Sequence, residues 1–134
     1  EMCIRDRSRA SNFLAGLRAA AERGTRIYGE CGGYMVLGET IIDAECTPYP
    51  MAGLLALETS FANRQLHLGY RRLPPLAQAW PGLEPVTGHE FHYTSATRAE
   101  GDPLFAVSDA AGRDLGTMGL VRGSVAGSYA HIIA

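Results

Sequence analysis

Apolar residues recur at helical spacing in residues 11–23, near the start of the chain. Ser11 is placed to cap the expected helix, and Gly24 to end it in a left-handed conformation. Residues 25–28 then indicate a short buried strand. Because a helix, a tight turn and a buried strand form the αβ unit of a doubly wound sheet, the pattern predicts the α/β class. The apolar face of the helix consists of Phe13, Leu14, Leu17, Ala20 and Ala21.

Beyond this unit the pattern changes to short runs typical of strands and turns. Residues 29–33 indicate a glycine-flanked turn, and residues 34–37 a short helix that Gly38 closes. The sequence thus predicts one domain with a strand-rich middle. We expect strands at residues 54–59, 65–73 and 89–97, strand and loop at 41–50, a loop at 74–85, a hairpin of residues 105–108 and 115–121, and a last short strand or strand-to-helix turn at 127–133.

Composition narrows the class of protein. The chain has 134 residues, 46% of them hydrophobic, and a formal net charge of −2. The length supports a single core, and the charge balance gives no reason to expect nucleic acid or an anionic membrane as a partner. No apolar run approaches the roughly 20 residues that span a bilayer, and no signal peptide is recognisable, so a cytoplasmic protein is expected. Three widely spaced cysteines without a CxxC or HExxH motif argue against a disulfide framework and a metal site.

The first residues differ in character from the rest. Residues 1–7 (EMCIRDR) are charged and begin with Glu rather than Met. We expect residues 1–10 to be a non-native or disordered tail and place a partial domain at residues 11–134. Cys3 is given no role.

The motif Gly29-Glu30-Cys31-Gly32-Gly33 carries the candidate chemistry. A cysteine in such a turn, between a strand and a helix, is the thiol version of a nucleophile elbow. The turn lifts the sulfur out of the sheet, and the helix N-terminus behind it is expected to lower the thiol pKa. The backbone N–H of Gly32 is then directed to the place where an oxyanion forms. The alternative is a small buried cysteine in a glycine turn.

A cysteine nucleophile needs a general base, most often histidine. The chain offers His67, His89, His92 and His131. His89 and His92 are three positions apart in one expected strand, so their side chains point to opposite faces. His67, between two leucines, has the pattern of a strand-surface histidine. Spacing alone leaves both His131 and His89 as candidates.

Four segments together give the chain a family resemblance: residues 27–35 (IYGECGGYM), 66–71 (LHLGYR), 88–93 (GHEFHY) and 123–131 (GSVAGSYAH). In this order and spacing they resemble the C-terminal glutamine amidotransferase domain of the cobyrinic acid and hydrogenobyrinic acid a,c-diamide synthases. The resemblance implies a class I glutamine amidotransferase-like, flavodoxin-like α/β sheet with helices, truncated at its N-terminus. Cys31 matches the family's nucleophile, and His131 matches the histidine that activates it.

The resemblance also places His89, Glu90 and His92 next to the site, because they belong to a family signature. Many class I amidotransferases orient the catalytic histidine with a glutamate two positions later, where this chain has Ile133. Glu90 is a candidate for that task; the alternative is a surface carboxylate. Arg71, which could face a corrin carboxylate, is expected at the surface.

The implied function is the glutaminase part of an ATP-dependent amide ligase of cobalamin biosynthesis. Glutamine hydrolysis would supply ammonia for amidation of the corrin a and c carboxylates. No cofactor is expected in this chain, which has no P-loop GxxxxGK[ST]; ATP and Mg²⁺ are expected for the full-length enzyme, whose missing synthetase domain would bind the corrin. A cobalt-containing corrin, a metal-free corrin and nickel-sirohydrochlorin all stay open as the acceptor.

The start of the chain bears on activity. Family members carry a glycine-rich segment before the first helix that supplies a second oxyanion donor, and here residues 1–7 stand in its place. Since one such donor is worth about 10²–10³ in rate, we expect a fragment with weak or no activity. Two alternatives remain: an inactive fragment that only retains the fold, and another Cys-His hydrolase of the class I amidotransferase superfamily.

Overall fold

The computed structural model describes residues 4, 6, 9–62, 66–76 and 84–133. Two helices and eleven strands lie wholly within these residues. The α/β class is therefore confirmed, with many strands and few helices. In chain order the elements are α2 (Ser11–Glu22), β1 (Ile27–Glu30), α3 (Gly32–Leu37), β2 (Thr40–Ile42), β3 (Pro48–Pro50), β4 (Ala56–Ser60), β5 (His67–Leu73), β6 (Val86–His92), β7 (Ser95–Glu100), β8 (Asp102–Asp109), β9 (Asp114–Arg122), β10 (Val125–Ser128) and β11 (His131–Ile132).

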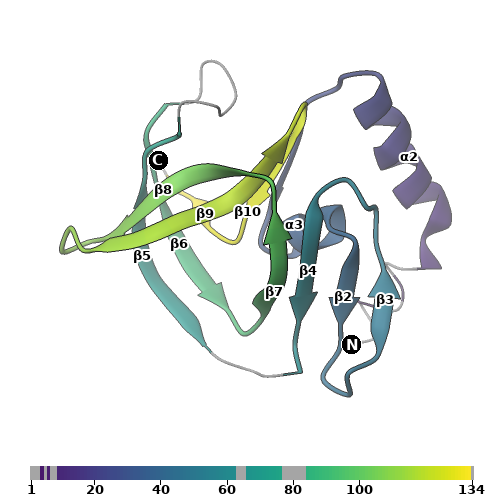
Figure 1. Cartoon of the computed structure of the whole chain (residues 1–134), viewed down its shortest axis with the longest axis horizontal. Helices are drawn as coiled ribbons and strands as arrows, with labels where there is room; N and C mark the ends of the chain where they lie inside the picture. The colour runs from purple at the N-terminus through teal and green to yellow at the C-terminus, as the bar shows by residue number, and fades with distance from the viewer. Residues whose placement is uncertain (1–3, 5, 7–8, 63–65, 77–83, 134) are drawn as a thin grey trace.

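The strands form two sheets (Figure 1). The larger sheet has seven strands in the order β1-β10-β9-β8-β5-β6-β11, and the smaller has four in the order β3-β2-β4-β7. Only β1 and β10 pair in parallel in the larger sheet; its other neighbours are antiparallel. The strands β1 and β11 are thus the two edges of the larger sheet.

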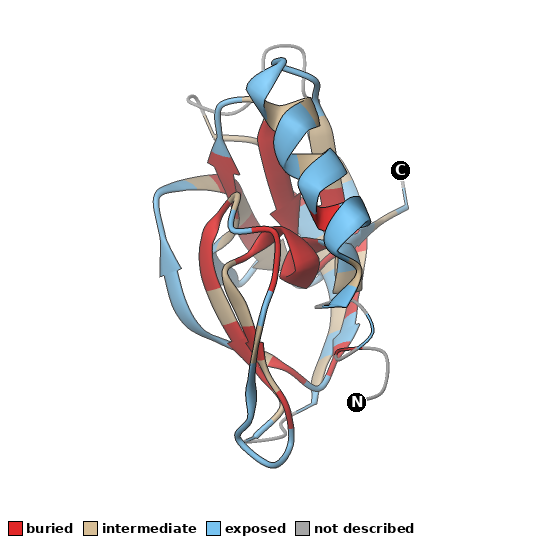
Figure 2. Ribbon diagram, turned by 90° about the vertical axis from the view of Figure 1, so that its right-hand side faces the viewer, coloured by how far each residue is buried: buried red, intermediate tan, exposed pale blue. Residues whose placement is uncertain are grey.

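Helix α3 lies near the centre of the molecule and contacts both sheets (Figure 1). Four of its six residues, from Tyr34 to Leu37, are buried. Helix α2, in contrast, covers the outside and is mostly exposed, as Figure 2 shows by its colour. Only Leu14 of α2 is buried, while Leu17 and Ala21 pack at the edge of the core. Burial of the short helix α3 therefore organises the core around the turn that precedes it.

The end of α2 agrees with the sequence prediction, and its beginning does not. Gly24 has a φ of 79°, and the N–H groups of Gly24 and Thr25 donate to the carbonyls of Ala21 and Ala20. This is the Schellman arrangement that favours glycine after a helix. Ser11, however, is the first helical residue rather than the cap, because Ala10 occupies the N-cap position without a side-chain hydrogen bond.

Two expectations about burial near β1 are wrong. Phe13, placed on the buried face of the helix, is 57% exposed. The strand predicted at residues 25–28 begins two residues later, at Ile27, and is half-buried rather than buried. Phe13 and Ile27 line the same groove between α2 and β1, so the side chains of the helix and the strand do not pack tightly against each other there.

The strand predicted at residues 89–97 is also wrong, because the chain changes sheets there. Strand β6 ends at His92 in the larger sheet, and β7 begins at Ser95 in the smaller one. The bend is held by His92, whose Nδ1 lies 2.9 Å from the carbonyl oxygen of Thr94. Thr94 is buried, and its hydroxyl donates a hydrogen bond to the hydroxyl of Tyr129 at 3.1 Å. A local hydrogen bond thus ends the alternating pattern.

The predicted hairpin is confirmed with longer strands, since β8 and β9 pair antiparallel across residues 110–113. Asp109 fixes this turn by accepting hydrogen bonds from the N–H groups of Ala111 and Arg113 at 3.0 and 2.9 Å.

Most of residues 1–10 lie outside the described residues, although Ile4 is described and is buried in the core. Among the described helices, none is long and apolar enough to cross a membrane.

Two glycines allow β1, β10 and α3 to approach one another. A Cβ on Gly29 would lie 2.7 Å from the carbonyl carbon of Gly33, and a Cβ on Gly127 would lie 2.6 Å from the carbonyl oxygen of Gly29. Both neighbours are backbone atoms, which cannot move aside as a side chain does. A Cβ on Gly33 would meet nothing within 4 Å. Gly29 and Gly33, two residues before and two residues after Cys31, therefore differ: a side chain fits at Gly33 and does not fit at Gly29.

We predict that Gly29→Ala destabilises the fold by about 3 kcal/mol, since inserting a methyl group into a packed contact costs this order of free energy. Gly33→Ala is the matched control in the same turn, and it should be neutral or stabilise by up to about 1 kcal/mol because alanine favours the helix. Urea denaturation of both variants measures this. Equal midpoints for Gly29→Ala and Gly33→Ala would show that the close approach is not a constraint.

Candidate active site

Cys31 occupies the turn between β1 and α3, as the sequence predicts. It is the N-cap residue of α3, with φ 52° and ψ −108°. A positive φ at a non-glycine residue stores about 1–3 kcal/mol of strain and persists only where surrounding contacts impose it. Here the N–H of Cys31 donates to the carbonyl of Ser128 at 2.9 Å, and its carbonyl accepts from Met35 at 3.1 Å. The strained elbow is therefore held from both sides.

The sulfur of Cys31 is half-buried and receives a backbone hydrogen bond from Gly32. Burial raises the pKa of the thiol above its ordinary value, the Gly32 N–H lowers it by less, and the charge of Glu30 raises it further. The expected lowering of this pKa is therefore wrong for this structure. Helix α3 has only six residues, so its dipole is small against the cost of desolvating a thiolate.

His131 lies in β11, at the edge of the larger sheet, and its side chain is 51% exposed. Its Nδ1 lies 3.8 Å from Oε1 of Glu30, the residue directly before Cys31. The other oxygen of the same carboxylate accepts the N–H of Ile132 at 3.1 Å. The structure thus brings His131 to the end of β1 that carries Cys31, across 100 residues of chain.

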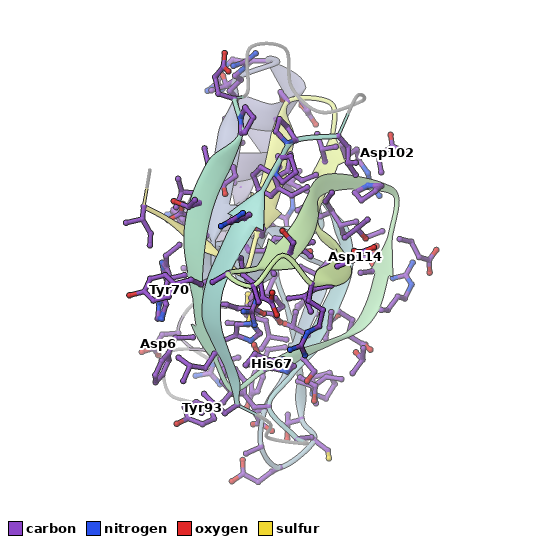
Figure 3. The ribbon with its side chains drawn as sticks, turned by 90° about the vertical axis from the view of Figure 1, so that its left-hand side faces the viewer. Asp6, His67, Tyr70, Tyr93, Asp102 and Asp114 are labelled. Atoms are coloured by element: carbon purple, nitrogen blue, oxygen red, sulfur yellow. The ribbon has the colours of Figure 1, made fainter. Side chains whose placement is uncertain are left out.

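The two histidines of β6 point to opposite faces, as predicted. His89 is directly opposite His131 in the pairing of β6 with β11, so these two side chains share the outer face. The ring of His89 lies 5.2 Å from the ring of Tyr70 on that face. Figure 3 shows Tyr70 projecting to one side of β5 and His67 to the other. His89 is therefore next to His131, while His92 is not.

Glu90 and His92 belong to a buried polar network on the inner face. One oxygen of Glu90 accepts from Nε of Arg71 at 2.9 Å, and the other lies 2.8 Å from Nε2 of His92. Burial opposes the charge of Glu90, but the hydrogen bonds from His92 and Arg71 outweigh it and lower the pKa of this carboxyl group. Both proposed roles of Glu90 are thus unsupported: it is neither exposed nor directed at His131. Arg71, expected at the surface, is partly buried, with 16% of its side chain exposed.

Aromatic rings continue this network toward the elbow. His92 stacks between His67, at a centroid distance of 4.7 Å, and Tyr129, at 3.9 Å. Tyr129 meets Tyr34 of α3 edge to face at 5.4 Å. His67 is therefore a half-buried member of this stack and not the surface histidine that its sequence neighbours suggest. Burial raises the pKa of Tyr129 to about 12, so its hydroxyl stays neutral at ordinary pH.

A cavity of about 450 Å³ borders this stack. His67, Glu90 and His92 line it, and one ligand atom of each lies within 4.8 Å of the others, close enough to hold a metal ion. The Arg71 guanidinium, however, already forms an ion pair with the Glu90 carboxylate. A cation there would have to displace an existing ion pair, so the geometry favours a structural network over a metal centre.

These features define the class of site: a strained cysteine in an elbow, an N–H of the following residue on its sulfur, and a histidine whose ring lies 3.8 Å from the carboxylate of Glu30, the residue before the cysteine. The chain belongs to the CobB/CobQ-like glutamine amidotransferase domain family, whose model matches residues 5–134. This membership supports the class I glutamine amidotransferase-like fold expected from the sequence.

Curated relatives agree with the family. The hydrogenobyrinate a,c-diamide synthases of Brucella anthropi and a Sinorhizobium species share 58% and 59% sequence identity with this chain, and each alignment covers 94% of the chain. The Rhodobacter capsulatus enzyme of the same name is 50% identical over 93% of it. In each case the match spans 29% of the relative's length, so the chain corresponds to less than a third of these proteins.

The buried network leads to a stability prediction. Glu90→Gln should cost about 3 kcal/mol near neutral pH, because Arg71 loses its buried partner. A carboxyl group whose pKa is lowered on folding stabilises the fold above its unfolded pKa of about 4.3 and loses that contribution as the pH falls through the folded pKa. The difference between Glu90→Gln and wild type should therefore shrink in acid.

Urea denaturation between neutral and acidic pH measures this difference. Glu100→Gln is the matched control, since Glu100 pairs with Arg98 at the surface and its side chain is 64% exposed. Its loss should stay below about 1 kcal/mol. A Glu90→Gln variant as stable as Glu100→Gln at neutral pH would contradict the structural role of the network.

Proposed function

We propose that the chain hydrolyses the side-chain amide of glutamine, with Cys31 as nucleophile and His131 as the general base and acid. The observation that carries this proposal is the elbow: a cysteine held at positive φ with the N–H of Gly32 on its sulfur, in a member of a glutamine amidotransferase family. The position of His131 at the same end of β1 supplies the proton acceptor.

In the first half of the reaction, the sulfur of Cys31 attacks the amide carbon of glutamine while His131 takes the thiol proton. The amide oxygen becomes negatively charged and accepts the N–H of Gly32. The C–N bond then breaks, and the proton on His131 goes to the leaving nitrogen, which departs as ammonia. A glutamyl thioester on Cys31 remains.

In the second half, His131 removes a proton from water, which attacks the thioester carbonyl. The C–S bond breaks, glutamate leaves, and the proton returns to the sulfur. The same N–H of Gly32 stabilises the charge on the oxygen in this step. Nitrogen, protons and charge balance over the two halves: glutamine and water give the free acid and ammonia, and the acid's proton then moves to ammonia to give glutamate and ammonium.

The raised pKa of Cys31 bears on how fast this proceeds. Burial leaves little resting thiolate at neutral pH, so the proton has to leave for His131 as the sulfur attacks. In the described residues, Gly32 is the one backbone donor that the structure directs at this sulfur. We therefore expect slow turnover from this chain by itself.

We extend the proposal to the larger relatives, which are named hydrogenobyrinate a,c-diamide synthases. In a protein of that length, ammonia from Cys31 would amidate the a and c carboxylates of the corrin, and hydrogenobyrinate is the acceptor that these names favour. ATP with Mg²⁺ would activate the carboxylates in the remaining part of the protein, and no residue described here is assigned to them.

The test is labelling with 6-diazo-5-oxo-norleucine, a glutamine analogue that alkylates the nucleophile of glutaminases. We expect one label per chain, located at Cys31 by mass spectrometry and absent in Cys31→Ser. His131→Asn should label at least about 10²-fold more slowly, the usual contribution of a general base. Cys46→Ser is the control, because Cys46 is exposed in another turn.

The other outcomes separate the alternatives. Labelling of Cys31 only by ester or peptide electrophiles would indicate a different Cys-His hydrolase. A folded chain that no reagent labels at Cys31 would indicate an inert domain. Either result would overturn the glutaminase proposal.

A further inference from the structure

We infer that Glu30 is the positioning residue of His131: its carboxylate holds the Nδ1 side of the ring and leaves Nε2 to take the proton of Cys31. This inference rests on the proposed glutaminase function. It assigns a task to the residue directly before the nucleophile, whereas the position two residues after His131 holds Ile133, which has no acceptor in its side chain.

The geometry of the Glu30 carboxylate carries the inference. Its Oε1 lies 3.8 Å from Nδ1 of His131, and its Oε2 accepts the backbone N–H of Ile132 at 3.1 Å. One carboxylate thus contacts two successive residues of β11. The backbone hydrogen bond to Ile132 fixes the strand, and the other carboxylate oxygen lies beside the ring that this strand carries.

The topology explains why such a contact is needed. Strands β1 and β11 are the opposite edges of the seven-stranded sheet, so no ladder hydrogen bond joins them. Strand β11 has two residues and pairs only with β6 in the described sheet. The backbone brings β11 near β1 through β10, which pairs with β1 and ends three residues before His131, and Glu30 adds the side-chain contact to the strand that carries the base.

The chemistry requires an acceptor at this place. A neutral imidazole has one N–H and one basic nitrogen, and the partner of one nitrogen decides which tautomer is present. A carboxylate only accepts, so Glu30 places the proton on Nδ1 and keeps Nε2 basic. The same charge raises the pKa of the neighbouring Cys31 thiol, which favours proton transfer to the ring during attack over a preformed thiolate.

Glu90 is the competing candidate, and the structure separates the two. Glu90 lies on the inner face of β6 with Arg71 and His92, while His131 shares the outer face with His89. The groups that face His131 in the described residues are Glu30 from β1 and His89 from β6. Of these two, only Glu30 is an obligate acceptor.

The experiment compares Glu30→Gln with Glu39→Gln in the full chain. The glutamine oxygen can still accept the N–H of Ile132, but its NH₂ group then faces Nδ1 and donates to it, which favours the opposite tautomer of His131. We expect the rate of Cys31 labelling by 6-diazo-5-oxo-norleucine to fall about 10²-fold. This is less than the ~10⁴-fold loss when a buried triad aspartate becomes asparagine, because Glu30 is partly exposed.

Glu39→Gln should leave the labelling rate unchanged, since Glu39 pairs with Arg98 outside the site. The second readout is the ¹⁵N NMR spectrum of the His131 ring, which distinguishes the two tautomers directly. We expect the Nδ1–H form in wild type and the Nε2–H form in Glu30→Gln. A merely structural role would lower the labelling rate without exchanging the tautomers, and that result would overturn the inference.

Failure of this inference is distinguishable from failure of the proposed function. If wild type is labelled at Cys31 and Glu30→Gln is labelled equally fast, Glu30 does not position His131 and the glutaminase proposal stands. If wild type itself is not labelled at Cys31, the glutaminase proposal fails, and the inference about Glu30 fails with it.

Discussion

The close approach of three backbone segments around Cys31 is the constraint on which the rest of the structure depends. Gly29 and Gly127 are opposite each other in the parallel pairing of β1 with β10, and the first turn of α3 packs directly on Gly29. Side chains at these two positions would push α3 away from the sheet. The positive φ of Cys31, the direction of the Gly32 N–H and the burial of α3 between the sheets all follow from this contact.

The histidine side of the site depends on a different support. Strand β11 pairs with β6, and β6 is anchored on its inner face by Glu90, which holds Arg71 and His92. The buried network therefore acts on the site at a distance, by fixing the strand against which His131 is placed. The nucleophile follows one edge strand of the sheet, the base lies on the other edge strand, and the Glu30 carboxylate contacts both β1 and β11.

The elbow and the α/β class could be predicted because their signals are local: a helix pattern, a left-handed glycine and a glycine-flanked cysteine. What the sequence did not reveal depends on non-local contacts. Strand β6 breaks because His92 bonds the Thr94 carbonyl, a departure that an alternating pattern does not show. Arg71 is partly buried because it pairs with Glu90, a partner 19 residues away in the sequence. The direction of the Cys31 pKa shift follows from burial, which no motif encodes.

The most direct test of this account is a crystal structure of the chain after reaction with 6-diazo-5-oxo-norleucine. We expect a bond from the inhibitor to Sγ of Cys31, with the inhibitor's ketone oxygen about 2.7–3.1 Å from the backbone nitrogen of Gly32. We also expect Nδ1 of His131 to face Glu30 and Nε2 to be directed at the sulfur. An adduct whose oxygen points away from Gly32, or a His131 ring that does not approach the sulfur, would contradict it.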